Sequence, residues 1–122
     1  MKWEVDLHDE FVPEYRKMHR DVQGELLAKI ELLERFGSQL GRPHVDTLHG
    51  SRHANMKELR FDAAGGLWRV AFAFDPKRKA ILLVAGDKSG LIEKRFYRRL
   101  IDKADARFEA HLAKVKGQKE RK

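Results

Sequence analysis

The chain has 122 residues, a length that fits one domain with its own buried core. It contains no cysteine, which excludes a disulfide framework and a thiolate metal site, and no apolar run approaches the roughly 20 residues of a membrane span. The net charge is +7, but residues 1–40 carry 6 Lys/Arg against 9 Asp/Glu, whereas residues 41–122 carry 20 against 10. This basic segment indicates a polyanion partner, nucleic acid first, although cations on solvated helix faces would give the same totals.

The first third of the chain predicts a strand and a helical hairpin. Apolar and charged residues alternate over residues 3–7, as in a strand with one buried face. Apolar residues at helical spacing then predict a short helix capped by His8 or Asp9. A second helix is expected, with Asp21 as its N-cap and Gly37 as its stop. Residues 38–54 are expected to form a long loop, either functional or mobile.

Three consecutive strands are predicted between residues 53 and 88, joined by turns at 62–66 and 75–79. Such a meander forms an antiparallel sheet whose side chains alternate between two faces. In the middle strand the large apolar side chains share one parity and are expected to face the core. Arg69 has the other parity, with Ala71 and Ala73, and Arg60 has the matching parity in the preceding strand. We therefore expect two arginines to converge on an open face with little to crowd a ligand.

The last third predicts a long helix with an apolar stripe over residues 92–112, and a break near Asp102 is allowed for. Its outer face is strongly basic. Residues 114–122 are expected to form a frayed basic tail of a single domain spanning residues 1–122. The start of the chain has no apolar signal core, so we expect a cytoplasmic protein without a membrane partner.

The histidines lie at 8, 19, 44, 49, 53 and 111, with no HExxH motif and no cysteine nearby. The chain also lacks a glycine-rich phosphate loop and a Gly-x-Ser-x-Gly motif. No metal site and no cofactor are therefore predicted.

A cationic set remains, with Glu58 nearby. It comprises His53, Lys57, Arg60, Arg69 and Lys88, and Tyr97 is also nearby. Phosphodiester cleavage without a metal needs a base for the 2′-hydroxyl, fixed cations for the transition state, and an acid for the departing 5′-oxygen. Arginine suits the second role, and a lysine among other cations suits the first or third. Each of these residues also has a purely structural alternative, such as an ion pair on a solvated sheet face. Lys57 shares its parity with Leu59, so it need not point in the same direction as Arg60.

Several blocks of the sequence together resemble the HigB-like branch of the RelE/ParE toxin superfamily, which includes phage-derived addiction toxins. They span residues 41–48, 50–53, 56–60, 68–70, 72–76 and 86–88. The resemblance covers nearly the whole chain. It implies an α+β, microbial-ribonuclease-like RelE fold with an N-terminal strand, a helical hairpin, a three-stranded antiparallel meander and a C-terminal helix.

The resemblance also implies the toxin of a type II toxin–antitoxin pair, a ribosome-dependent mRNA endonuclease that stops translation and growth. Cleavage in such toxins proceeds by 2′-hydroxyl attack and leaves a 2′,3′-cyclic phosphate. The implied partners are the ribosome, its mRNA and a small helix-turn-helix antitoxin, with operator DNA bound only through the toxin–antitoxin complex.

The resemblance implies catalytic roles for residues that match family motifs. The sheet arginine of the family corresponds to Arg69, and the basic residue that closes the last strand corresponds to Lys88. The basic strand motif corresponds to Lys57 and Arg60, although Glu58 stands where RelE has a second lysine.

Two further catalytic assignments and the RNA-binding residues rest on weaker correspondence. The C-terminal tyrosine of RelE has no unambiguous counterpart, and Tyr97 is the best candidate. HigB members use histidines instead, for which His53 is the best local candidate. RNA contacts are expected from Arg52, Lys94 and Arg95. A ParE-like gyrase poison without nuclease activity and an inactive RNA-binding relative remain as alternatives.

Overall fold

The computed structural model describes residues 2–120, except for the side chains of residues 119 and 120. Five strands form one sheet in the spatial order β1-β5-β4-β3-β2. These strands are β1 (Val5–Leu7), β5 (Ala80–Asp87), β4 (Gly66–Phe74), β3 (Lys57–Ala63) and β2 (Val45–Thr47). β1 pairs with β5 in parallel, and the other neighbours are antiparallel. The predicted meander is thus the centre of a larger sheet, with a short strand added at each edge.

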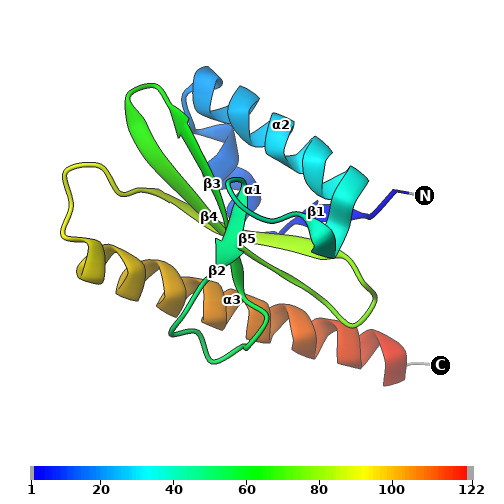
Figure 1. Cartoon of the computed structure of the whole chain (residues 1–122). Helices are drawn as coiled ribbons and strands as arrows, with labels where there is room; N and C mark the ends of the chain where they lie inside the picture. The colour runs from blue at the N-terminus through cyan, green and yellow to red at the C-terminus, as the bar shows by residue number, and fades with distance from the viewer. Residues whose placement is uncertain (1, 121–122) are drawn as a thin grey trace.

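Helices cover both faces of this sheet, as Figure 1 shows. α1 (Phe11–Arg16) and α2 (Arg20–Phe36) lie on one face, and α3 (Glu93–Glu120) runs across the other. A short 3-10 helix, η1 (Gly37–Gln39), follows α2. Among residues 2–120 no helix is both long and apolar enough to cross a membrane.

Two hairpins set the register of the meander. β3 and β4 are joined by Ala64 and Gly65, both with positive φ, which is the backbone of a tight two-residue hairpin turn. Between β4 and β5 the Asp75 carboxylate accepts hydrogen bonds of 2.9 Å from the backbone N–H groups of Lys77 and Lys79. The first of these turns sets the register of β3 and β4, in which Arg60 lies directly opposite Arg69.

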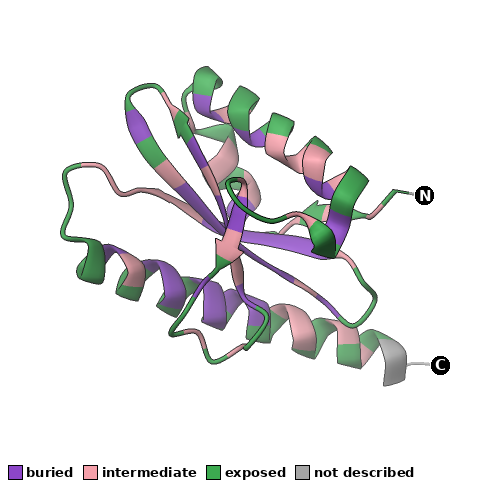
Figure 2. Cartoon of the chain, in the orientation of Figure 1, coloured by how far each residue is buried: buried purple, intermediate pink, exposed green. Residues whose placement is uncertain are grey.

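The two faces of the sheet are packed with side chains of different size. Val70 and Phe72 of β4 are fully buried against the first two helices. On the other face Ala71 and Ala73 are equally buried, beneath the apolar stripe of α3. Figure 2 shows this buried stripe of α3 turned toward the sheet and an exposed side turned away. Small side chains allow a helix to approach a sheet closely, so the alanines are a packing surface.

The expectation of an open face around Arg69 is therefore wrong, because α3 lies over it. α3 packs tightly on β5 at Gly86, where a Cβ atom would stand 2.7 Å from the Phe96 ring of α3. Arg69 itself is only 6% exposed. A helix whose apolar stripe includes Phe96, Leu100 and Phe108 needs a surface to bury it, and this face supplies one.

The α+β fold predicted from the sequence is confirmed, with differences in detail. α2 ends at Gly37 as predicted, but its N-cap is His19, whose ring accepts the Asp21 N–H. The expected loop over residues 38–54 contains η1 and β2. α3 passes Asp102 without a break and continues through residues 114–120, so the structure draws most of the expected tail as helix. Residues 121 and 122 of that tail lie outside the described residues.

Candidate functional site

The strand register brings two arginines together on the α3 face of the sheet. Arg60 of β3 and Arg69 of β4 are cross-strand partners, and Glu58 lies two residues before Arg60 on the same face. Side chains at paired positions of an antiparallel sheet point the same way and lie close together. The convergence of Arg60 and Arg69 on one face is as the alternation predicted.

Arg69 is held in a nearly closed environment. Its Nη1 donates a 2.8 Å hydrogen bond to the Trp68 carbonyl, and its Nε lies 3.9 Å from Glu58 Oε1. The Nε–H is buried and has no hydrogen-bond partner among the described residues. An unsatisfied buried donor costs about 1–3 kcal/mol, and more when the group is charged. Because the Nε–H is closed off from solvent, an acceptor from outside could reach it only after neighbouring side chains move.

Glu58 is the centre of a buried polar contact between sheet and helix. The Tyr97 hydroxyl of α3 donates a 2.9 Å hydrogen bond to Glu58 Oε1. Burial raises the pKa of Glu58 above its usual range, and this outweighs the opposing effects of Tyr97 and Arg69. Burial, followed by the hydrogen bond to Glu58, raises the pKa of Tyr97 to about 12. Near neutral pH Tyr97 is therefore a neutral hydroxyl and not a phenolate.

Lys88 and Arg60 each have a carboxylate partner. Lys88 Nζ donates a 2.8 Å hydrogen bond to Glu93 Oε1, which lowers the pKa of Glu93, and it lies 5.9 Å from the Tyr97 ring centre. Arg60 Nη1 lies 3.5 Å from Asp46 Oδ2. The predicted cations are thus near one another but are paired with acidic side chains.

A hollow of about 520 Å³ opens beside the two arginines. We call it the cationic hollow, because its basic side chains outnumber its two acidic ones, Glu25 and Asp62. The basic side chains that line it are Lys29, Arg42, His44, Arg60 and Arg69. The backbone fixes one of its walls, because the Arg60 N–H donates a 2.9 Å hydrogen bond to the His44 carbonyl. Such a cavity, rich in fixed donors, suits a phosphate group better than an apolar ligand.

Sequence reasoning did not assign a site role to Arg42 or His44. Arg42 donates a 2.9 Å hydrogen bond to Asp46, which is the main reason that the pKa of Asp46 lies below its usual range. His44 is half-buried and carries the imidazole of the cationic hollow. The available signal was their place in one of the family-like blocks, since neither fits a metal or catalytic spacing.

Three predicted site residues are not brought to this cluster. Lys57 lies opposite Phe72 on the other face of the sheet, as its parity indicated. His53 packs edge-on against Phe108 with its ring centre 5.0 Å away, and Phe108 follows Tyr97 by eleven residues along α3. That separation is about 16 Å at the rise of an α-helix. Arg52 lies beside His53 and pairs with Glu109 at 2.8 Å.

Lys94 and Arg95 are exposed at the start of α3. Among the described residues, no three His, Asp or Glu side chains are grouped so that they could hold a metal ion.

Comparison with known proteins agrees with the motifs. Residues 13–109 match the model of the family described as phage derived protein Gp49-like (DUF891). Two Mycobacterium tuberculosis (strain ATCC 25618 / H37Rv) proteins are similar along most of this chain. Putative toxin HigB3 is 48% identical over 100 residues, covering 82% of this chain and 85% of HigB3. Putative toxin HigB2 is 46% identical over 103 residues, covering 84% of this chain and 51% of HigB2, so the chain spans about half the length of that relative.

Solved structures with the same fold are more distant in sequence. A mutant of E. coli toxin RelE in the free state superposes with a TM-score of 0.59 at 14% identity, covering 84% of this chain and 97% of RelE. An archaeal RelE from the RelE–RelB complex of Pyrococcus horikoshii OT3 superposes with a TM-score of 0.52 at 18% identity, covering 74% and 99%. The RelE-like fold and the HigB-like resemblance are thereby confirmed, and the chain belongs to the Gp49-like family of phage-derived proteins.

Proposed function

We propose that the chain is the toxin of a type II toxin–antitoxin pair and acts as a ribosome-dependent mRNA endonuclease. The observation that carries this proposal is the cross-strand pair Arg60–Arg69 at the cationic hollow, with the Arg69 Nε–H unsatisfied. Two relatives that are 46% and 48% identical carry the name of toxin, which supports the same reading.

The proposed reaction needs no metal. Arg60 and Arg69 would donate to the phosphate oxygens and stabilise the charge that develops in the transition state. His44 is the proposed acceptor of the 2′-hydroxyl proton, because an imidazole changes its charge near neutral pH and this one lines the same hollow. The attack of the 2′-oxygen on phosphorus breaks the bond to the 5′-oxygen of the next nucleotide and leaves a 2′,3′-cyclic phosphate. The departing 5′-oxygen would take a proton from water.

Lys88 and Tyr97 are retained in the proposal as groups on the α3 side of Arg69. Each is tied to a carboxylate, Lys88 to Glu93 and Tyr97 to Glu58. A phosphate that enters would compete with these carboxylates for the cations. Binding of RNA is therefore expected to weaken the contact of Glu58 with Arg69 and that of Glu93 with Lys88. Arg60 is less buried than Arg69, so its side chain should need to move less.

The proposed protein partner is a small helix-turn-helix antitoxin. The archaeal structural neighbour was solved as a RelE–RelB complex, which supports a toxin-binding partner for this chain as well. Operator DNA would be contacted through the complex only. Co-expression with the product of the adjacent reading frame should restore growth if that product is the antitoxin.

Induced expression with primer extension on a reporter message tests the activity. Discrete, codon-spaced 5′ ends that appear only on translated message are expected. Intact message together with broken chromosomal DNA would instead indicate a gyrase poison. Growth arrest without either lesion would indicate an RNA-binding relative without nuclease activity. The second and third outcomes would each overturn the endonuclease proposal.

A further inference from the structure

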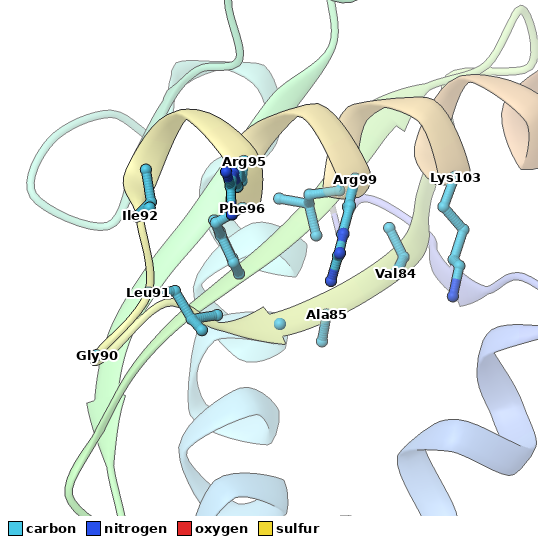
Figure 3. Close-up of a pocket in the computed structure, with 11 residues that line it drawn as sticks. Val84, Ala85, Gly90, Leu91, Ile92, Arg95, Phe96, Arg99 and Lys103 are labelled. Carbon is cyan, nitrogen blue, oxygen red and sulfur yellow. The ribbon is translucent and has the colours of Figure 1, made fainter.

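A second cavity, which shares no lining residue with the cationic hollow, lies between β5 and the first three turns of α3 (Figure 3). It has a volume of about 400 Å³, and we call it the β5–α3 groove. Its floor is formed by the backbone and small side chains of residues 84–86, and its apolar wall by Phe96 and Leu100. Leu91 and Ile92 stand at its mouth and are 59% and 61% exposed. Adjacent large apolar side chains exposed at a cavity indicate an interaction surface.

The floor of this groove is a strand edge without a neighbour among the described residues. β1 pairs only with residues 80–82, whereas β5 continues to Asp87. The Lys88 N–H donates to the Leu67 carbonyl on β4, so the alternation of an antiparallel ladder turns the N–H and C=O of Ala85 away from β4. An unpaired edge of this kind can accept a further strand from another chain.

Cations form the opposite rim of the groove. Arg95, Arg99 and Lys103 follow one another at four-residue spacing along α3, about 6 Å apart along the helix axis. Figure 3 shows the side chains of Arg99 and Lys103 extending from α3 toward the β5 edge. All three are exposed. The ion pairs of α3 within residues 2–118 are made by other side chains: Glu93, Arg107, Glu109, His111 and Lys114.

We propose that the β5–α3 groove binds an acidic segment of a partner protein, added as an extra strand along the free edge of β5. Alternate apolar side chains of that segment would contact Leu91, Ile92 and Leu100, and its carboxylates would meet the three cations. RNA fits the groove less well. The one aromatic side chain in the lining of the groove, Phe96, is 8% exposed and offers no surface for a base to stack on. The inference rests on the proposed function only in taking the antitoxin as the natural source of the segment.

An NMR titration of the isotope-labelled full chain tests the proposal. The probe is a blocked peptide of about ten residues that alternates Glu and Val, matching the period of a strand. Amide shifts are expected at Ala85, Gly86 and Leu91, and not at His44 or Arg60, which line the cationic hollow. Arg95→Glu with Arg99→Glu should weaken peptide binding about tenfold. Lys94→Glu with Arg98→Glu changes the net charge equally beside the groove and should weaken it far less.

Three outcomes would overturn the inference: no binding of the peptide, equal weakening by both double variants, or tighter binding at the groove of a single-stranded oligoribonucleotide of similar length. A second variant, Leu91→Ser with Ile92→Ser, removes apolar contact without changing charge. It should lose peptide binding and still cut message. If this variant loses peptide binding but still cuts message, the proposed function stands. If the parent chain binds the peptide at the groove but cuts no message, only the nuclease proposal is refuted.

Discussion

Tyr97 on α3 donates a hydrogen bond of 2.9 Å to Glu58 on β3, and this contact joins the helix to the sheet face that carries Arg69. Glu58 is buried and Tyr97 is half-buried, so the loss of this donor would leave a buried carboxyl group with one partner fewer. The position of α3 over Arg69 therefore depends on polar as well as apolar contacts.

Removal of the Tyr97 hydroxyl should destabilise the protein. Tyr97→Phe keeps the ring and its packing against Phe96 but leaves Glu58 without its donor. We expect a loss of about 1–2 kcal/mol in the free energy of unfolding, measured with urea near neutral pH. Tyr15→Phe is the matched control, because Tyr15 packs on the opposite face of the sheet. Equal stability of Tyr97→Phe and the parent chain would show that this hydrogen bond contributes nothing.

The pH dependence of stability should reveal the buried carboxyl of Glu58. Burial raises its folded-state pKa above the ordinary value of 4.5, so the folded protein holds this proton to a higher pH than the unfolded chain. The stabilisation that the protonated Glu58 carboxyl provides is present in full below the unfolded-state pKa and is lost as pH rises through the folded-state pKa. Glu58→Gln should remove this part of the fall in stability above pH 4.5.

Urea titrations at several pH values between about 4 and 8 would measure that slope. Glu31→Gln, at an exposed position on α2, is the control and should keep the slope of the parent chain. A Glu58→Gln profile parallel to the parent profile would mean that Glu58 titrates alike in the folded and unfolded states.

The alternation in β3 and β4 was sufficient to predict the two faces of the sheet and the placing of Arg60 and Arg69 on the same face. It was not sufficient to predict what covers Ala71 and Ala73, because small side chains suit an open ligand face and a close helix contact equally well. The deciding fact is the length of the apolar stripe on α3. With α1 and α2 on one face, the alanine face was the remaining surface on which that stripe could be buried.

The cationic hollow was only half predictable for a related reason. Arg60 and Arg69 lie on regular strands, so their direction follows from parity. His44 lies in irregular backbone before β2, and its place depends on the hydrogen bond between its carbonyl and the Arg60 N–H. β2 itself has three residues, too few for any periodic signal. His53 was predicted beside the arginines because it precedes the β3 strand in sequence. The conformation of the loop that places its ring against Phe108 cannot be inferred from the pattern of that strand.

Two glycine substitutions should have opposite effects on stability. At Gly86 a new Cβ atom would stand 2.7 Å from the Phe96 ring, so Gly86→Ala must displace the start of α3. We expect a loss of about 1–3 kcal/mol. At Gly24, inside α2, a Cβ atom meets nothing within 4 Å, and Gly24→Ala should add about 0.5–1 kcal/mol. Thermal unfolding of both variants checks the signs, and a stabilised Gly86→Ala would contradict the close packing.

Arg107 makes another set of polar contacts between α3 and the rest of the protein. Its guanidinium donates 2.8 Å and 2.7 Å hydrogen bonds to Glu14 of α1 and to the Leu83 carbonyl. Arg107→Met should cost about 2–3 kcal/mol, because it removes charged hydrogen bonds from a buried position. Arg98→Met, at an exposed position of the same helix, should change stability by less than about 0.5 kcal/mol.

The same contact has a pH signature of opposite sign to that of Glu58. The Arg107 hydrogen bond lowers the folded-state pKa of Glu14 below its ordinary value of 4.5. Its stabilisation is therefore present above the unfolded pKa and is lost as pH falls through the folded pKa. Arg107→Met should be less sensitive than the parent chain to acid below pH 4.5, as measured by urea unfolding. If Arg107→Met and the parent chain lose stability equally below pH 4.5, the contact with Glu14 does not contribute to the stabilisation by Arg107.

The guanidinium fork of Arg69 should be required for message cleavage, beyond its charge. Arg69→Lys keeps one positive charge but cannot present two parallel donors, so we expect the cleavage rate on ribosome-bound message to fall about a hundredfold. Arg35→Lys makes the same chemical change at an exposed position near the end of α2 and should leave the rate unaltered. Melting temperatures of both variants, taken alongside, separate lost chemistry from lost folding. A folded Arg69→Lys protein that cuts as fast as the parent chain would remove Arg69 from the site and leave Arg60 and His44 to be tested in its place.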